Sequence, residues 1–266
     1  MRTLNRIKLG LSLLAIAFST PSALAASDWR INPQGNGVTD ASTVSTLGVG
    51  GVGYIQIQPD ALTPGQYSFI EHGAYQAYAP NSTAPFPGHE ITITYSVLGT
   101  SNLGDPAALR MTGGRIDLYS DAGGDFGTYA PNYGADNGTH FGSFNIVSGY
   151  VANRQGQVIV NAQGISGSFA PGFLFNSDGV DLANLPNIQL QLALYNQQIQ
   201  PDGPIIAGVI CGIANACAAN RLAQSQTSLT VQDTGSVSIS AVPEPLAPAM
   251  WLLGLGLIGG IARRRR

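Results

Sequence analysis

Apolar and polar residues alternate strictly along two stretches of the chain. Between Ile91 and Val97 the alternate residues are threonine and serine, and between Ile188 and Leu194 they are mainly glutamine. A period of two places the apolar side chains on one face of an extended chain, so both stretches are predicted to be half-buried β-strands. Weaker patterns of the same kind predict strands at Tyr54–Gln58, Tyr67–Glu71, Arg115–Tyr119, Phe141–Val147, Val158–Asn161 and Val237–Ser240.

Turn residues separate these strands. Glycine and proline recur about every ten residues, and no strand–helix–strand rhythm is visible. The chain is therefore predicted to be all-β, with one antiparallel β-sandwich or jelly-roll-like domain over residues 26–241. Helical periodicity is best over Ile205–Gln226, where Gly208 and Gly212 weaken it. The glycines at 48, 50 and 53 fit G-x-G-x-x-G, but a strand-like run follows them, so we expect a flexible turn.

The first 25 residues have the organisation of a signal peptide. Arg2, Arg6 and Lys8 precede an apolar run from Leu9 to Ser19 that is too short to span a membrane. The small residues Ala23 and Ala25 then fit the small-x-small rule for cleavage, so removal of residues 1–25 is predicted.

The last 25 residues, 242–266, combine three elements. Pro243, Glu244 and Pro245 are followed by an uncharged run over residues 246–262 and by four arginines, Arg263, Arg264, Arg265 and Arg266. A helix of about 18 residues is roughly 27 Å long, which is enough to cross a bilayer core. Arginines resist translocation, so the tail is predicted to stay in the cytoplasm while the rest of the chain is exported.

This tail resembles the PEP-CTERM sorting signal of Gram-negative bacteria, in which a Pro-Glu-Pro triplet, an apolar helix and a basic end occur in this order. The resemblance implies that a membrane-embedded exosortase recognises the tail and cleaves near the triplet. It also implies a precursor anchored in the inner membrane and facing the periplasm, and then a product at the cell surface or in the extracellular matrix. The alternative is an ordinary tail anchor that follows a proline-rich spacer.

Charge and cysteine content narrow the class of protein. Residues 26–243 contain five arginines, no lysine and 14 acidic residues, a formal net charge of −9. Nucleic-acid binding needs a positive face, so no nucleic-acid partner is predicted. Cys211 and Cys217 are the only cysteines of the chain. Because the exported compartment is oxidising, a disulfide between them is predicted.

A glycine-rich segment between residues 117 and 140 holds the candidate binding residues. Carboxylates such as those of Asp117, Asp121, Asp125 and Asp136 are the oxygen ligands that Ca²⁺ prefers. However, the first three are spaced by four residues, which fits no known calcium loop, and solvated turns use the same residue types. No cofactor is therefore predicted, and bound Ca²⁺ is the one alternative.

The same segment carries aromatic residues. The rings of Phe126, Tyr129 and Tyr133 could stack on sugars while neighbouring polar groups bind hydroxyls. The alternative is that these rings anchor a long loop to the β-domain. A glycan-binding surface is thus one of two interpretations of this segment.

Signs of catalysis are weak, and the protein is predicted not to be an enzyme. Glu71 and Glu90 are the only glutamates before the sorting signal and could in principle form the carboxyl pair of a glycosidase. The serine elbow G-x-S-x-G and the zinc motif H-E-x-x-H are both absent.

A second resemblance extends over most of the exported segment. The chain resembles the flocculation-associated PEP-CTERM proteins in four motifs: Gln66–Gly73, Ile91–Ser96, Asp117–Asp121 and Asp136–Thr139. It implies an exported protein that associates with exopolysaccharide and acts in cell aggregation, flocculation or biofilm. The alternatives are a carbohydrate-binding module for matrix polysaccharide and, less in keeping with the residues, a matrix glycoside hydrolase.

Overall fold

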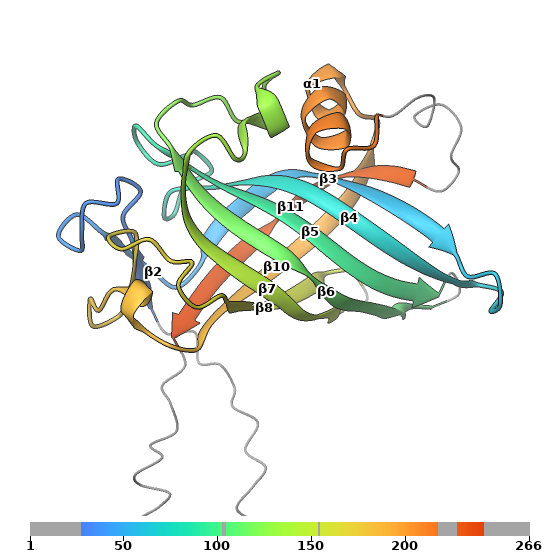
Figure 1. Ribbon diagram of the computed structural model, residues 1–266, viewed down its shortest axis with the longest axis horizontal. Helices are drawn as coiled ribbons and strands as arrows, with labels where there is room; N and C mark the ends of the chain where they lie inside the picture. The colour runs from blue at the N-terminus through green and yellow to red at the C-terminus, as the bar shows by residue number, and fades with distance from the viewer. Residues whose placement is uncertain (1–27, 103–104, 154, 218–227, 242–266) are drawn as a thin grey trace, which may run out of the picture.

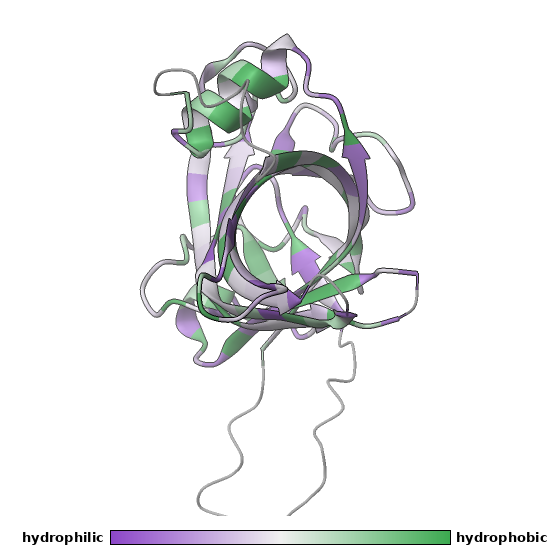
Figure 2. Ribbon diagram, turned by 90° about the vertical axis from the view of Figure 1, so that its right-hand side faces the viewer, coloured by the Kyte–Doolittle hydropathy of each residue, from purple (hydrophilic) through white to green (hydrophobic). Residues whose placement is uncertain are grey.

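Eight antiparallel strands form a closed barrel. The computed structural model describes residues 28–241 except 103–104, 154 and 218–227. The strands follow one another around the barrel in the order β10-β11-β3-β4-β5-β6-β7-β8, and Figure 2 shows the closed ring they form. Their bounds are β3 (Leu47–Pro59), β4 (Gln66–Ala77), β5 (Glu90–Asn102), β6 (Asp105–Asp121), β7 (Thr139–Val151), β8 (Val158–Gly164), β10 (Ile188–Ile199) and β11 (Ser228–Ala241).

The predicted all-β, antiparallel class is confirmed, but the sandwich or jelly-roll arrangement was wrong. The sheet closes because β11 pairs with β3 over ten residues, from Ser228 opposite Gln56 to Val237 opposite Leu47. Alternation along a strand identifies its buried face but not whether the sheet curls far enough to meet its own edge. Inward glycines favour such curling. A Cβ added at Gly73 would lie 2.3 Å from the ring of Tyr95, which occupies that space.

The barrel interior contains the alternating apolar residues that the sequence predicts. Ile91, Ile93, Tyr95 and Val97 are all buried in the main core, as are the four apolar residues between Ile188 and Leu194. The weaker strands are also present, and most are longer than predicted. The glycines between residues 48 and 53 lie inside β3, so the predicted flexible turn was wrong.

A small three-stranded sheet closes one end of the barrel. It has the order β2-β1-β9, with β1 (Trp29–Ile31), β2 (Ser42–Val44) and β9 (Leu174–Asn176). Its apolar residues belong to the same core as the barrel interior, and Phe173 stacks on Phe141 of β7 with ring centroids 4.9 Å apart. We call this the plugged end and the opposite one the far end. The described chain begins and ends at the plugged end (Figure 1).

A helix packs on the outside of the barrel against β3 and β4 (Figure 1). A short α-helix, α1 (Gly203–Ile205), continues as a π-helix, η3 (Ile206–Ile213). With Val52 and Tyr54 of β3 the helix forms a second, smaller core. The predicted helix over 205–226 is thus confirmed only as far as Ile213, and residues 218–226 lie outside the described part. The short 3₁₀ helices are η1 (Pro131–Gly134) and η2 (Leu182–Asn184).

The addressing segments were predicted at the two ends of the chain. The signal peptide, with Ala23 and Ala25, and the sorting signal, with Pro243 to Pro245 and Arg263 to Arg266, lie outside the described residues. The same holds for the predicted membrane helix over 246–262. Among residues 28–241, as far as they are described, no helix has the length and apolar character needed to cross a membrane.

Candidate functional site

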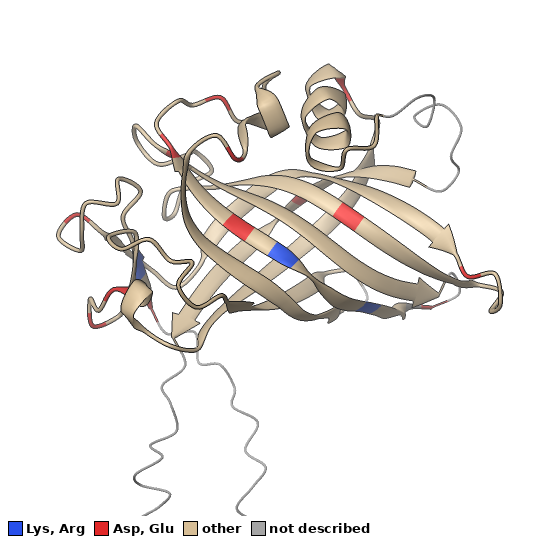
Figure 3. Cartoon of the chain, in the orientation of Figure 1, with Lys and Arg blue, Asp and Glu red and all other residues tan. Residues whose placement is uncertain are grey.

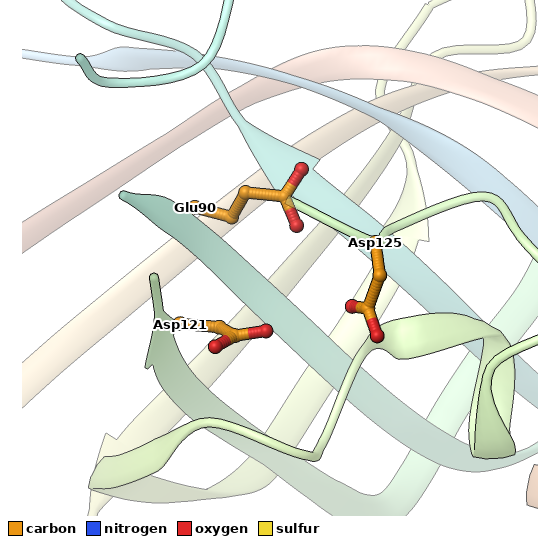
Figure 4. A group of neighbouring side chains, drawn as sticks. All are labelled: Glu90, Asp121 and Asp125. Carbon is orange, nitrogen blue, oxygen red and sulfur yellow. The ribbon is translucent and has the colours of Figure 1, made fainter. Parts of the chain in front are cut away.

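Three carboxylates converge at the plugged end. Glu90 begins β5, Asp121 ends β6, and Asp125 lies on the loop between β6 and β7 (Figure 4). One oxygen of each lies within 4.8 Å of the others. Glu90 is buried, and its oxygens accept hydrogen bonds from the Gln76 amide at 2.7 Å and the Phe126 backbone N–H at 3.1 Å. This trio is the best-placed oxygen cluster for a cation in the described part of the chain.

The two aspartates of the trio also accept hydrogen bonds from the loop between β6 and β7. Asp121 accepts the Gly123 N–H at 2.9 Å, and one oxygen of Asp125 accepts the Asn137 amide at 2.8 Å. The other oxygen of Asp125 is buried and has no hydrogen-bond partner among the described residues. A buried carboxylate oxygen without a partner is costly, so a cation or a water molecule at this position would be stabilising.

The other two aspartates of the predicted calcium set point elsewhere. Asp117 accepts two bonds from Arg115 at 2.8 and 2.9 Å and one from the Ser143 hydroxyl at 2.5 Å, on the outer surface of the barrel. Asp136 accepts the Asn132 amide at 2.7 Å. The structure therefore brings together Asp121 and Asp125 with Glu90, which the sequence reasoning did not include.

A polar hollow lies beside the trio. It has a volume of about 390 Å³, and its lining includes His89, Ser120, Asp121, Asn137, Thr139 and Phe173. Hydroxyl, amide and carboxylate groups thus line the hollow, and such groups can bind the hydroxyls of a sugar. More of the acidic residues of the described chain lie on loops than on the barrel strands (Figure 3).

The three candidate aromatic residues have different surroundings. The Phe126 and Tyr133 rings meet edge to face at 5.2 Å and pack against the outer core beneath the helix. A Cβ added at Gly208 would lie 2.4 Å from the Tyr133 nitrogen, so this helix glycine permits the loop to approach. Only Tyr129 is largely exposed, at 71%. The Cys211–Cys217 disulfide links the last part of the helix to the residues that follow it, with 4.6 Å between the Cα atoms.

A second polar cluster lies inside the barrel. Glu71 of β4 and Asp233 of β11 lie diagonally across Gly53 of β3, and both are buried. A Cβ at Gly53 would lie 2.8 Å from Glu71 Oε1 and 3.2 Å from Asp233 Oδ2, so these two oxygens are at most 6.0 Å apart. The Tyr75 hydroxyl donates to Asp233 Oδ2 at 2.7 Å, and the Tyr95 hydroxyl donates to Glu71.

Burial changes the acidity of this pair. The pKa of Glu71 is raised to about 8, mainly because burial removes hydration from the carboxyl group and secondly because Asp233 repels its charge. Loss of hydration likewise raises the pKa of Asp233 to about 7, although the bond from Tyr75 opposes this shift. Glu71 Oε1 and Asp233 Oδ1 are buried and have no partner among the described residues. The pair therefore holds protons at neutral pH that ordinary carboxyl groups would have lost.

Glu71 and Glu90 do not form the carboxyl pair that a glycosidase needs. Glu71 points into the barrel, where it lines a cavity with Tyr95 and Met111, whereas Glu90 points outward to Gln76 and the loop. The barrel wall separates them. Asp233 is the carboxyl group that the fold places near Glu71.

The class of protein is that of a closed eight-stranded β-barrel whose last strand, β11, ends where the C-terminal tail begins. The family model of the PEP-CTERM protein-sorting motif matches residues 241–266. This match confirms the predicted sorting signal, and it supports an exosortase-sorted surface protein that is made as a membrane-anchored precursor. No curated protein matches the chain in sequence.

Proposed function

We propose that this protein acts in the extracellular matrix, where it associates with exopolysaccharide and helps cells to aggregate as flocs or biofilm. One observation carries the proposal: the sorting motif begins at Ala241, the last residue of β11, so the signal is attached directly to the barrel. A stable barrel with acidic loops is a suitable extracellular cargo. The proposed role is non-enzymatic, in keeping with the separation of Glu71 from Glu90 by the barrel wall.

Deletion of residues 242–266 in the native host tests this proposal. Export should continue because the signal peptide is intact, whereas cell-associated protein and flocculation should both be lost. The measurements are immunoblots of the cell and medium fractions and the sedimentation rate of the cells. Unchanged aggregation would contradict the proposed role.

A matched variant separates exosortase sorting from an ordinary tail anchor. Replacement of Pro243 and Pro245 by Ala and of Glu244 by Gln keeps the apolar run and the four arginines. Under exosortase sorting, uncleaved precursor accumulates in the inner membrane, whereas an ordinary anchor would behave like the wild type.

The second candidate function is carbohydrate binding at the plugged end, and the 390 Å³ polar hollow favours it. Asp121 belongs both to this hollow and to the carboxylate trio, so bound Ca²⁺ would lie beside the sugar. We therefore propose Ca²⁺ at Glu90, Asp121 and Asp125 as part of this second candidate.

Asp121→Asn should lower retention of the full-length protein on the host's exopolysaccharide by about tenfold, the effect of losing one charged hydrogen bond. Asp178→Asn, on an exposed turn away from the hollow, is the matched control and should bind like the wild type. Addition of EDTA should reproduce the loss if calcium takes part. Equal retention of the two variants would remove the hollow as a glycan site.

A further inference from the structure

A cavity inside the far end of the barrel reaches the buried Glu71 carboxyl group. It has a volume of about 110 Å³, and its walls are mostly apolar, with Ile55, Phe69, Met111 and Leu194 among the lining residues. Glu71 and Tyr95 provide polar groups at its inner part, and Asn196 is exposed at its rim. Eight-stranded barrels of this kind are wide enough to hold one small ligand. An enclosed apolar cavity of about 150 Å³ accepts benzene, so one ring would fill this smaller cavity and reach its open rim at Asn196.

The carboxyl group of Glu71, at the inner end of this cavity, has one oxygen that accepts no hydrogen bond from the described residues. Glu71 is only 3% exposed, and its Oε1 has no hydrogen-bond partner among the described residues. The second carboxyl group, Asp233, lies across Gly53 and also keeps one oxygen unpartnered. The other titratable groups of the cluster, Tyr75 and Tyr95, are donors that are already used by these acids.

The charged groups at the cavity indicate which kind of ligand it can bind. No arginine or histidine is among its lining residues, so the two acids have no cationic neighbour there. Two carboxyl groups this close in an apolar medium cannot both ionise unless a positive charge arrives with a partner. A neutral donor would satisfy Oε1 but would leave the two acids protonated. An ammonium group satisfies the acceptor and supplies the positive charge that allows Glu71 to give up its proton.

We infer that the far-end cavity binds a small apolar amine, about the size of one six-membered ring, with its ammonium group at Glu71 and its apolar body against the barrel walls. This site is separate from the glycan hollow and lies at the opposite end of the barrel. It does not depend on the proposed role in aggregation.

Isothermal titration of the full-length protein at pH 7 tests this inference, with benzylamine, benzyl alcohol and toluene as probes of similar shape. Benzylamine should bind at least tenfold more tightly than the two neutral probes. Glu71→Gln should weaken benzylamine at least tenfold. Asp178→Asn, which removes an exposed carboxyl group on a turn and does not line the cavity, is the control and should leave the affinity unchanged. Toluene binding as tight as benzylamine binding, or an unchanged affinity in Glu71→Gln, would overturn the inference.

A measurement on the wild type alone keeps the test decisive even if a variant fails to fold. Because the acids hold protons at pH 7, entry of an ammonium group should displace about one proton per ligand. Titrations in buffers with different ionisation enthalpies measure this release, which should fall toward zero at pH 9. Binding without proton release at pH 7, or no binding of benzylamine at millimolar concentration, would overturn the inference as well.

Discussion

Between pH 5 and pH 8 the full-length protein is expected to become markedly less stable. In the folded protein the pKa of Glu71 is about 8 and that of Asp233 about 7, against ordinary values of 4.5 and 3.8. Over this window the folded state therefore holds protons that the unfolded state has lost. The free energy of unfolding then falls with pH, by up to about 1.4 kcal/mol per pH unit for each group.

The sign of this dependence can be checked by thermal unfolding at pH 5, 6, 7 and 8. Each kcal/mol of stability that is lost lowers Tm by roughly 2–4 °C for a domain of this size. The half-buried His72 acts in the opposite sense, because burial lowers its pKa and the unfolded imidazole takes up a proton below about pH 6.5. The net effect is still a loss of stability as the pH rises, since two acids oppose one imidazole.

Glu71→Gln provides the decisive comparison. The amide cannot ionise, so the variant should show a shallower decline and a higher Tm than the wild type at pH 8. Leu62→Ala, which changes no titratable group and lies at an exposed position, should keep the wild-type slope. A wild-type Tm that is constant or rises between pH 5 and pH 8 would show that the interior acids do not titrate as the structure requires.

Loss of the plug should have an effect of similar size. The Trp29 side chain is buried in the main core, and its indole N–H donates to the Ser45 carbonyl at 3.2 Å. Removing such a side chain leaves a cavity that the barrel rim cannot fill. Trp29→Ala should therefore cost about 3–5 kcal/mol, and Tm should fall by roughly 6–20 °C.

Urea unfolding followed by circular dichroism measures this cost. Leu62→Ala is the matched control, because Leu62 is 92% exposed on a turn and its loss should change stability by no more than about 0.5 kcal/mol. If Trp29→Ala unfolded at the wild-type urea concentration, the small sheet would contribute nothing to barrel stability.

The sequence predicted strands best where every second side chain is large. The alternation over 91–97 and 188–194 identified both the strands and their inward faces. In β3 the first half contains Gly48, Gly50, Gly51 and Gly53, which have no side chains to alternate, so only the part from Tyr54 onward was visible. Closure of the barrel depends on β11 meeting β3, a pairing between residues about 180 positions apart that no local pattern encodes.

The candidate sites show the same limit. Asp121 and Asp125 were found because they lie in one glycine-rich segment, whereas Glu90 joins them only through the pairing of β5 with β6. The burial of Glu71 could have been predicted from the sequence. It lies at an even spacing from Phe69 and Tyr75, so all three side chains point to the same, inward face of β4. Its partner Asp233 could not be inferred without the closed barrel.

The last described strand ends at the plugged end of the barrel. A tail that continues from Ala241 therefore leaves the barrel at the end that holds the small sheet. Cleavage near Pro243 would release the barrel without breaking any of its strand pairs, because the pairing of β11 with β10 ends at Ala241. Processing of the tail can therefore leave the fold of the barrel unchanged.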